Sequence, residues 1–462
     1  MLSCYRILDL TEPESWLCGM VLAQLGAEVI VVEPAGGRDC SDLRPSWREA
    51  YLRGRTLLEG GLSEVHDVVA GVDAVIGSDV AGIDLAALRA ANPALVTLSI
   101  TPWGETGPKA TWRASDLVLA AAGGHVILNG DADRPPVRIS EPQAFHHAAS
   151  EAVVHLVVAL MERQRSGLGQ HIDIAAHQCM LQASQSQMLA AAVGAVPPRR
   201  FGGGVRLANY TIRLVYPASD GHVAVTFLFG DMIGRYTQRL MQWVHAEGHC
   251  SDEIRDLDYI RFFELIYGGS LAPSTLQEAS DAIARLTSTK TKAQLLEAAM
   301  ERNLLIAPVS TTADSLDFDQ FQSRGFWNAA TISDGTTVLH PGSWARATRT
   351  PLRTLGAAGT PGTDNERLVE LTVREPPASP SCTLHQSEVG AERPLSGLKI
   401  LDFSWVLAGP LATRLLADLG ATVVRIENER RPDVIRASGP FLAGEEGGDA
   451  TALWHNTAAG KY

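Results

Sequence analysis

One sequence pattern occurs twice in this chain of 462 residues, first at the amino-terminal end and again close to the carboxyl-terminal end. Residues 5–33 read YRILDLTEPESWLCGMVLAQLGAEVIVVE, and residues 398–427 read LKILDFSWVLAGPLATRLLADLGATVVRIE. Three pairs of residues fix the alignment: Asp9 with Asp402, Gly26 with Gly420, and Glu33 with Glu427. A pattern of this length that recurs after most of the chain predicts that a whole unit has been duplicated.

Each copy predicts a β-α-β unit. An apolar run is followed by a loop and then by a stretch with Leu and Ala at helical spacing. A Leu-Gly-Ala sequence ends the helix, where the glycine can adopt the left-handed conformation. A second apolar run follows, at residues 29–32 in the first copy and 423–426 in the second. Because a helix joins the two strands, they are expected to lie parallel in one sheet.

The same alternation continues after the first copy. Residues 63–78 and 84–100 each predict a helix that leads into a strand, and residues 144–164 predict a longer helix followed by a strand at 171–174. The loop at residues 101–108 carries two glycines and two prolines at a strand end. Ligands bind at this edge of an open α/β sheet.

The length and composition predict a globular protein with more than one domain. Hydrophobic residues make up 45% and charged residues 20%, and the net charge of −13 gives a nucleic acid no electrostatic attraction. The six cysteines include no Cys-x-x-Cys pair, which argues against a zinc site and fits a reducing compartment. No apolar run reaches the ~18–20 residues of a membrane span. We therefore expect a cytoplasmic protein without a metal, a membrane or a nucleic-acid partner.

A dinucleotide-binding fold is the first explanation that a β-α-β start suggests. That fold needs a Gly-x-Gly-x-x-Gly loop, so that the backbone can approach the pyrophosphate. The loops after Leu10 and Phe403 do not contain this pattern. Glu33 and Glu427 imitate the acid that binds a nicotinamide ribose, but without the glycines this interpretation is disfavoured.

Several ordered motifs resemble those of the class III CoA-transferases and the related acyl-CoA racemases, a family that includes formyl-CoA and carnitine CoA-transferases. In the second copy the motifs are Gly397 to Phe403, Ala408-Gly409-Pro410, Leu416 to Ala421 and Arg425-Ile426-Glu427. In the first unit they include Trp103 to Pro108, Asp116, Arg163 to Gln170, Asp220-Gly221 and Ala307-Pro308-Val309. The resemblance covers residues 1–372 and begins again at residue 395.

The resemblance implies a Rossmann-like α/β large domain with an inserted, smaller α+β domain. In this chain the large domain would comprise residues 1–205 and 331–372, and the small domain residues 210–330. Residues 373–394 are rich in Pro and Ser without periodicity and are expected to be a linker. Residues 395–462 would be the incomplete start of a second unit. Two units of the family interlock like links of a chain, so the expected partner is a second copy or the second unit of a longer chain.

The resemblance also implies an activity, the movement of CoA between an acyl-CoA and a carboxylic acid. In the family a carboxylate attacks the thioester, so that one acyl transfer is split into easier steps. Counting back from the glycine that matches Gly167, the position of the family's Asp falls on Ala144 or Phe145. Glu141 is the acid of that loop and the catalytic candidate, whereas Glu151 falls inside the following helix at a solvated position. The first unit is therefore expected to be degenerate, with the chemistry in the second.

The CoA contacts of the family also transfer to particular residues. The backbone of Val406, Leu407 and Ala408 matches the segment that lies against the adenine and ribose. Basic contacts to CoA are expected from Arg113, Arg425 and Lys461. Residues 202–204 match a loop over the active site, or form a flexible interdomain link.

Two other functions remain open. The racemase branch of the family places a His directly before the residue that matches Asp116, and this chain has Ser115 there. Racemisation is therefore disfavoured. The second alternative is a non-catalytic CoA-binding or assembly partner.

Overall fold

The computed structural model describes residues 1–40, 46–77, 82–195, 200, 202–207, 210–231, 233–332, 335–373, 393–430, 432–442 and 450–462. The contacts within the chain define two compact units. The larger unit comprises Met1–Leu128, Val137–Pro198 and Arg324–Tyr462, and the smaller comprises Asn129–Pro136 and Arg199–Ser323. The expected linker at 373–394 lies almost wholly outside the described residues.

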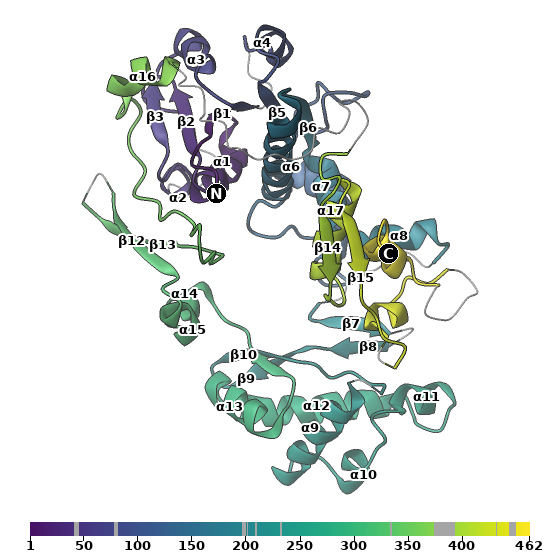
Figure 1. Ribbon diagram of the computed structural model, residues 1–462. Coiled ribbons are helices and arrows are strands. Elements are labelled where there is room, and N and C mark those ends of the chain that lie inside the picture. Colours follow the sequence, from purple (N-terminus) through teal and green to yellow (C-terminus); the bar gives the residue numbers. More distant parts are fainter. Residues whose placement is uncertain are drawn as a thin grey trace. The chain divides into compact units, whose positions relative to one another are not determined.

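A six-stranded parallel sheet forms the centre of the larger unit (Figure 1). Its strands are β1 (Arg6–Leu10), β2 (Glu28–Glu33), β3 (Thr56–Glu59), β4 (Ala74–Gly77), β5 (Val96–Thr101) and β6 (His171–Ala175). The strand order is β3-β2-β1-β4-β5-β6, so the direction of winding changes between β1 and β4. The predicted α/β class is confirmed.

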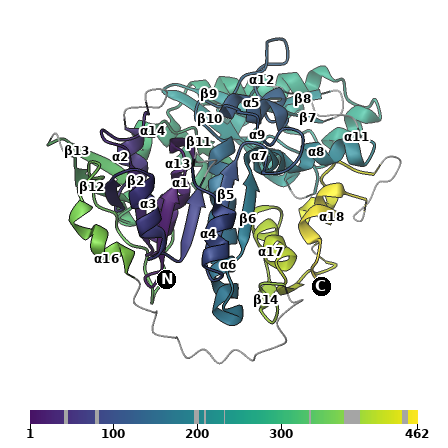
Figure 2. The same ribbon diagram turned by 90° about the horizontal axis from the view of Figure 1, so that it is seen from above.

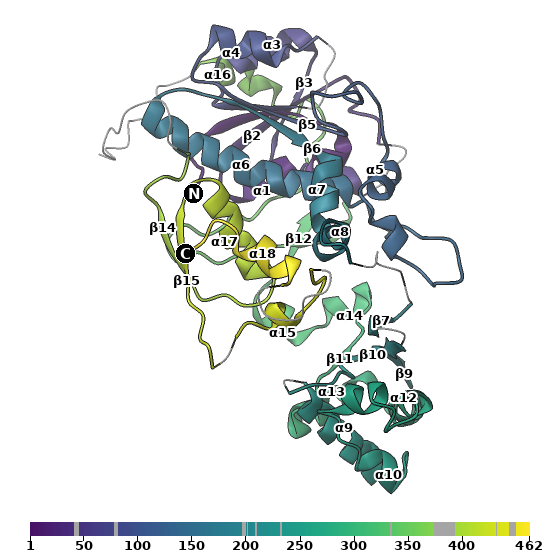
Figure 3. The same cartoon turned by 90° about the vertical axis from the view of Figure 1, so that its right-hand side faces the viewer.

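Helices cover both faces of this sheet, which explains why its strands are almost continuously apolar. Figure 3 shows α1 (Leu17–Gln24) and α6 (Ala144–Ser166) on one side, and α3 (Leu62–Val69), α4 (Leu85–Ala91) and α16 (Leu368–Thr372) on the other. Ile7 and Val29 belong to the core on the α6 side, whereas Leu8 and Ile30 belong to the core on the α3 side. The alternating strand residues thus enter two separate cores.

Among the described residues, α6 is the one helix long and apolar enough to cross a membrane by length and composition. Its buried residues, among them Ala152, Leu156 and Leu160, belong to the core of the larger unit. A buried core helix meets the same criteria of length and composition as a membrane span.

The second copy folds as the repeat predicts. Its elements are β14 (Lys399–Asp402), α17 (Ala408–Asp418) and β15 (Thr422–Arg425), and the two strands are parallel. Ile400 pairs with Val423 as Ile7 pairs with Val29, so the register of the two copies is identical. The glycines after both helices are left-handed, with φ of 106° at Gly26 and 108° at Gly420. On the α17 side, Val158 of α6 packs with Ala417 and Val423, and Figure 2 shows α17 beside α6.

The smaller unit contains a three-stranded antiparallel sheet and several helices. Its strands are β9 (Val215–Ala218), β10 (Gly221–Val225) and β11 (Ile306–Pro308), and a hairpin is formed by β7 (Gly204–Leu207) and β8 (Tyr210–Arg213). The helices are α9 (Gly234–Ala246), α10 (Asp252–Arg255), α11 (Phe262–Tyr267), α12 (Ser274–Ser288), α13 (Lys292–Arg302), α14 (Thr312–Leu316) and α15 (Asp319–Ser323). Its apolar core includes Tyr216, Phe227, Trp243 and Leu286.

The remaining elements belong to the larger unit. They are η1 (Pro13–Ser15), α2 (Trp47–Tyr51), α5 (Asp116–Ala122), η2 (Val126–Leu128), α7 (Ala176–Ala183), α8 (Gln185–Ala192), β12 (Trp327–Thr331), β13 (Thr337–Pro341), η3 (Asn365–Arg367), η4 (Val434–Ala437) and α18 (Ala452–Ala458). Of these, η1 and α2 follow β1 and β2, and α5 follows β5, at the edge of the sheet where a ligand is expected.

Candidate functional site

A buried aspartate ends the first strand and organises the loop after it. Asp9 accepts hydrogen bonds at Oδ1 from the backbone N–H of Thr11 at 2.9 Å and from its hydroxyl at 2.7 Å. At Oδ2 it accepts a hydrogen bond of 2.6 Å from Nη1 of Arg55. Both side chains of this ion pair are fully buried. Gly19 passes so close that a Cβ there would lie 2.2 Å from Oδ2 of Asp9, which explains the glycine in α1.

The second copy repeats this arrangement with a different cation. Asp402 accepts hydrogen bonds at Oδ1 from the backbone N–H of Ser404 at 2.8 Å and from the Ser404 hydroxyl. At Oδ2 it accepts hydrogen bonds from Thr413 Oγ1 at 2.6 Å and from Lys461 Nζ at 3.2 Å. Lys461 follows Gly460 as Arg55 follows Gly54. In both copies a buried carboxylate at the end of the first strand therefore holds the loop after that strand. The same carboxylate binds the basic residue of a later segment, Arg55 in the first copy and Lys461 in the second.

The hydrogen bonds change the acidity of this carboxyl group. Burial by itself raises the pKa of Asp402, but the hydrogen bonds from Ser404, Thr413 and Lys461 outweigh it and lower that pKa to about 2. Hydrogen bonds to the ionised form have this effect in general. Asp402 is therefore ionised at neutral pH and holds Lys461 in place.

The glutamates at the ends of the second strands also have matching partners. Glu33 is fully buried and makes two contacts of 2.7 Å with the guanidinium of Arg48. Glu427 accepts hydrogen bonds of 2.9 and 2.8 Å from Nε and Nη2 of Arg436, which lower the pKa of this carboxyl group. Both carboxylates are therefore held by protein side chains in a two-point geometry.

The segment predicted to lie against the adenine and ribose is a strained loop at the start of α17. Val406 has φ of 66°, which is costly for a β-branched residue, on the order of 1–3 kcal/mol. Its backbone N–H donates to Oδ2 of Asp433 at 3.0 Å, and Asp433 forms a buried ion pair with Arg425. Leu407 and Ala408 follow directly, at the N-terminus of the helix.

Two of the predicted CoA contacts, Arg425 and Lys461, are themselves part of these networks. The guanidinium of Arg425 lies 4.6 Å from the ring of Trp454, in addition to its pair with Asp433. The side chain of Lys461 is 2% exposed, and it also donates to the carbonyl of Pro410 at 2.6 Å and to Thr413 Oγ1 at 2.8 Å. Both residues hold the loop that contains Val406, and their contact with CoA stays a prediction.

The third basic residue, Arg113, lies in an exposed loop after β5. Within the described part of the chain, its side chain has no ion pair or hydrogen bond to the protein. Lys109 of the same loop lies 4.9 Å from the ring of Trp103 and 5.1 Å from that of Trp112. Arg113 is therefore free to bind an anion, in contrast to Arg425 and Lys461.

The N-terminus of α6 contains Ala144 and Phe145, the two residues predicted at the position of the family's aspartate. Ala144 begins the helix and is buried, and the half-buried Phe145 packs on the main core. Asp116 accepts hydrogen bonds of 2.7 Å from the backbone N–H groups of both Gln143 and Ala144. A carboxylate from α5 therefore caps α6, while the two candidate positions carry apolar side chains.

Aromatic residues from another part of the sheet edge lie against this helix end. The ring of Trp47 stacks on His146 at 5.6 Å with an angle of 9°, and Tyr51 Oη lies 3.3 Å from Nε2 of His146. Burial lowers the pKa of His146. Burial also raises the pKa of Tyr51, and the negative charge of Glu141 raises the pKa of Tyr51 further. Glu141 itself is half-buried in the loop before α6.

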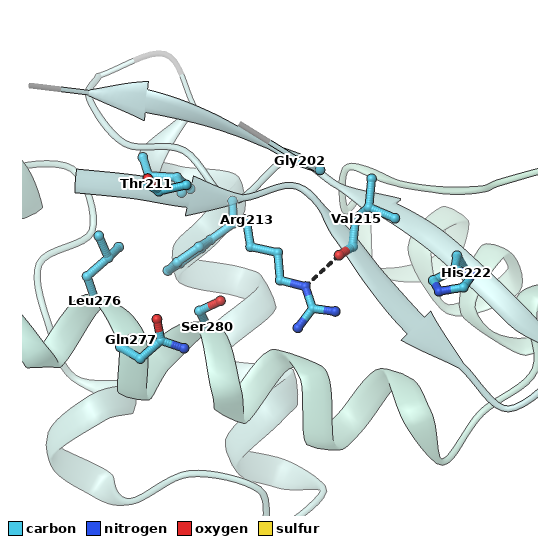
Figure 4. Close-up of a pocket in the computed structure, with 11 residues that line it drawn as sticks. Gly202, Thr211, Arg213, Val215, His222, Leu276, Gln277 and Ser280 are labelled. Carbon is cyan, nitrogen blue, oxygen red and sulfur yellow. Dashed lines mark hydrogen bonds between the residues drawn. The ribbon is translucent and has the colours of Figure 1, made fainter. Parts of the chain in front are cut away.

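The smaller unit contains a pocket that includes none of the residues predicted to bind CoA or to act as the nucleophile. Its volume is about 510 Å³, and Gly202 and Gly203 of the glycine-rich segment contribute to its wall. Arg213, Gln277 and Ser280 point into it from β8 and α12 (Figure 4). Nε of Arg213 donates to the carbonyl of Val215 at 2.6 Å, which fixes the guanidinium at the wall.

Comparison with known proteins gives one consistent family. The sequence profile of CoA-transferase family III matches residues 2–365 and 395–462. A protein of Mycobacterium tuberculosis described as a probable CoA-transferase is 29% identical over 441 residues, which are 90% of this chain and 52% of that protein. The chain therefore spans about half the length of this relative.

Two further relatives match over most of their own length. The succinyl-CoA:(R)-benzylsuccinate CoA-transferase subunit BbsE of Thauera aromatica is 28% identical, with 74% of this chain and 87% of that protein covered. A CAIB/BAIF family protein from Brucella suis has a crystal structure that matches with a TM-score of 0.67 at 24% identity, covering 79% of this chain and 98% of that one. This structural match supports the α/β fold of the larger unit.

The low pKa of Asp402 predicts a specific pH dependence. Its pKa is below the ~3.9 of an unfolded Asp, so the stabilisation is present above pH ~4 and is lost as the pH falls towards 2, by about 2 kcal/mol in total. We expect the free energy of local unfolding at β14, measured by native-state hydrogen exchange, to show this loss in the wild type and in the exposed control Asp418→Asn. Asp402→Asn is expected to lack it. An unchanged pH profile in Asp402→Asn would contradict the assignment.

Proposed function

The chain belongs to CoA-transferase family III, and on that premise we propose that it is part of an enzyme that transfers coenzyme A between an acyl-CoA and a carboxylic acid. The match of the family profile over residues 2–365 and 395–462 carries the proposal. Relatives that are named for transfer between succinyl-CoA and another acid support acyl-CoA and carboxylate as the two substrate classes. Coenzyme A is then a substrate, and the reaction requires no metal.

The proposed chemistry uses an enzyme carboxylate as the nucleophile. The carboxylate attacks the thioester carbonyl, and CoA leaves as a thiolate, which gives a mixed anhydride. The thiolate then attacks the enzyme's acyl carbon, which releases the first acid and leaves CoA on the enzyme as a thioester. The acceptor acid reverses these two steps. Splitting the transfer in this way lowers each barrier, and backbone N–H groups beside the carboxylate would stabilise the tetrahedral oxyanions.

We propose that the first unit does not supply this carboxylate. Its two candidate positions carry Ala144 and Phe145, and the N–H groups of Gln143 and Ala144 are occupied by Asp116. Glu141 is the nearest acid before the helix, but it comes several residues before Ala144 and Phe145. It is therefore a weaker candidate for the nucleophile than an acid of the second unit. The nucleophile would then come from the second unit, which residues 395–462 begin.

The matching geometry of the two copies supports a tandem arrangement. The register of the strands, the buried aspartate and the glutamate–arginine pair recur in residues 395–462. The relative of twice the length is consistent with two fused units. In this proposal the small domain at residues 210–330 is inserted into the first unit, residues 373–394 link the units, and the two units interlock within one chain or between copies in the cytoplasm.

A non-catalytic CoA-binding or assembly partner is the second candidate function of this chain. The apolar residues at the nucleophile position favour it, because CoA binding does not need the carboxylate. A racemase is less well supported, since Ser115 replaces the family's His and Asp116 caps α6.

Arg113 offers a direct test of CoA binding. Arg113→Ala is expected to weaken the affinity for CoA roughly tenfold or more, because a hydrogen bond to a charged group contributes about 1.5–3 kcal/mol. Isothermal titration of the 462-residue protein with CoA measures the effect. Arg261→Ala, an exposed arginine of the smaller unit, is the control and should leave the affinity unchanged. Equal affinities of both variants and the wild type would remove Arg113 from the site.

The covalent intermediate distinguishes the roles of the two units. After incubation with succinyl-CoA, the 462-residue protein is expected to carry no hydroxylamine-sensitive CoA adduct by intact mass, and Glu141→Gln should behave identically. A family member with two complete units should form the adduct and lose it when the Asp of its second unit is changed to Ala. An adduct on this chain that disappears in Glu141→Gln would place the chemistry in the first unit. If the two-unit protein forms no adduct and transfers no CoA, the proposed function itself fails.

A further inference from the structure

The pocket of the smaller unit combines one arginine with apolar walls. Its volume of about 510 Å³ lies within the range of small-molecule sites, which is roughly 300–1,000 Å³. Ile212, Phe227 and Leu276 contribute to the wall, and all three belong to the buried core of the smaller unit. The pocket therefore presents a packed apolar surface together with the charged group of Arg213.

The guanidinium of Arg213 is held in one orientation at this pocket. Arg213 is the last residue of β8, and its Nε donates to the carbonyl of Val215 at 2.6 Å. Its guanidinium carbon lies 5.1 Å from the centre of the Tyr216 ring. Because the group is already oriented by these two contacts, a ligand that binds it costs little further side-chain entropy.

The two terminal nitrogens of this guanidinium are available to a ligand. Within the described part of the chain, Arg213 has no ion pair, and its hydrogen bond to the protein uses Nε and leaves Nη1 and Nη2 without a partner. Asp281, whose charge acts on Tyr216, accepts a hydrogen bond of 2.8 Å from Nε2 of Gln277. Nη1 and Nη2 can therefore donate to both oxygens of one carboxylate, the two-point geometry to which arginine is suited.

A hydroxyl group supplies a second donor to the same pocket. Ser280 Oγ lies 3.0 Å from Oη of the buried Tyr216. Burial raises the pKa of Tyr216 to about 12, so this phenol is protonated at neutral pH. Tyr216 can then donate to Ser280, which leaves the hydroxyl proton of Ser280 for an acceptor in the pocket. Figure 4 shows Ser280 and Arg213 among the residues that line it.

We infer that this pocket binds a small organic acid with one carboxylate and an apolar body. The carboxylate would pair with Arg213 and accept from Ser280, while the apolar body would lie against the wall formed by Ile212, Phe227 and Leu276. A phosphoryl group carries close to two negative charges, and one arginine leaves part of that charge unpaired. Binding here is independent of the proposed transfer reaction, because the residues predicted to bind CoA do not line the pocket.

The probe for this site is 3-phenylpropionate, and its neutral amide is the matched ligand control. Isothermal titration of the 462-residue protein is expected to show saturable binding of the acid. Arg213→Gln should weaken this binding at least about tenfold, because hydrogen bonds to a charged group are lost. Arg213→Lys should also weaken it, since an ammonium group lacks the planar fork. Arg235→Gln removes another exposed arginine of the smaller unit and should leave the affinity unchanged.

Two further measurements locate the ligand and its charge. 3-Phenylpropanamide should bind the wild type and Arg213→Gln with equal affinity, because it has no charge to pair with the guanidinium. Hydrogen exchange should show protection of residues 211–216 and of α12 when the acid is added. Far-UV circular dichroism verifies the fold of each variant.

Three results would overturn the inference. They are the absence of saturable binding of 3-phenylpropionate, equal affinities of Arg213→Gln and the wild type for it, and binding of inorganic phosphate at least as tight as that of the acid. The titration needs no CoA and no turnover. A protein that binds the acid, in a family whose two-unit member transfers no CoA, would therefore count against the proposed function alone.

Discussion

A buried carboxylate paired with a basic side chain is the interaction on which each copy of the repeated unit depends. Asp9 with Arg55, and Asp402 with Lys461, tie the end of the first strand to the loop after it and to the chain entering the third strand position. Buried ion pairs are favourable only when further hydrogen bonds satisfy the charges. Thr11 and Ser404 supply these bonds, and Trp16 and Pro410 accept from the cations. The loop after the first strand is thereby held at its start, by the carboxylate, and at its end, by the basic side chain.

This constraint has different consequences in the two copies. In the first, it supports a sheet edge where Trp47 and Tyr51 contact His146 near the N-terminus of α6. In the second, it supports the strained loop at Val406. A loop held at positive φ by a buried aspartate is pre-organised, because the strain is balanced by the surrounding contacts. The two copies therefore share a scaffold and differ in what they present at its edge.

The sequence predicted those parts of the fold that local patterns encode. Apolar runs, helical spacing and the Leu-Gly-Ala stops lie within a few residues of one another, and they gave the β-α-β units and the helix at 144–164 correctly. The strand order and the meeting of Trp47 and Tyr51 with His146 join segments that are far apart in the chain, and no local pattern reports them. The basic residues predicted to contact CoA show the same limit. Among the residues that the structure describes, Arg113 has no protein partner, whereas Arg425 and Lys461 pair with Asp433 and Asp402, which would compete with a phosphate for the same charges.

The most direct test of this account is the coupling energy within each ion pair. Double-mutant cycles with Asp9→Ala and Arg55→Ala, and with Asp402→Ala and Lys461→Ala, can be read from hydrogen exchange at β1 and β14. The account predicts that both pairs couple favourably by about 0.5–3 kcal/mol, the range found for residues in one network. Additive effects in either cycle, with a coupling energy near zero, would contradict the claim that one interaction organises both copies.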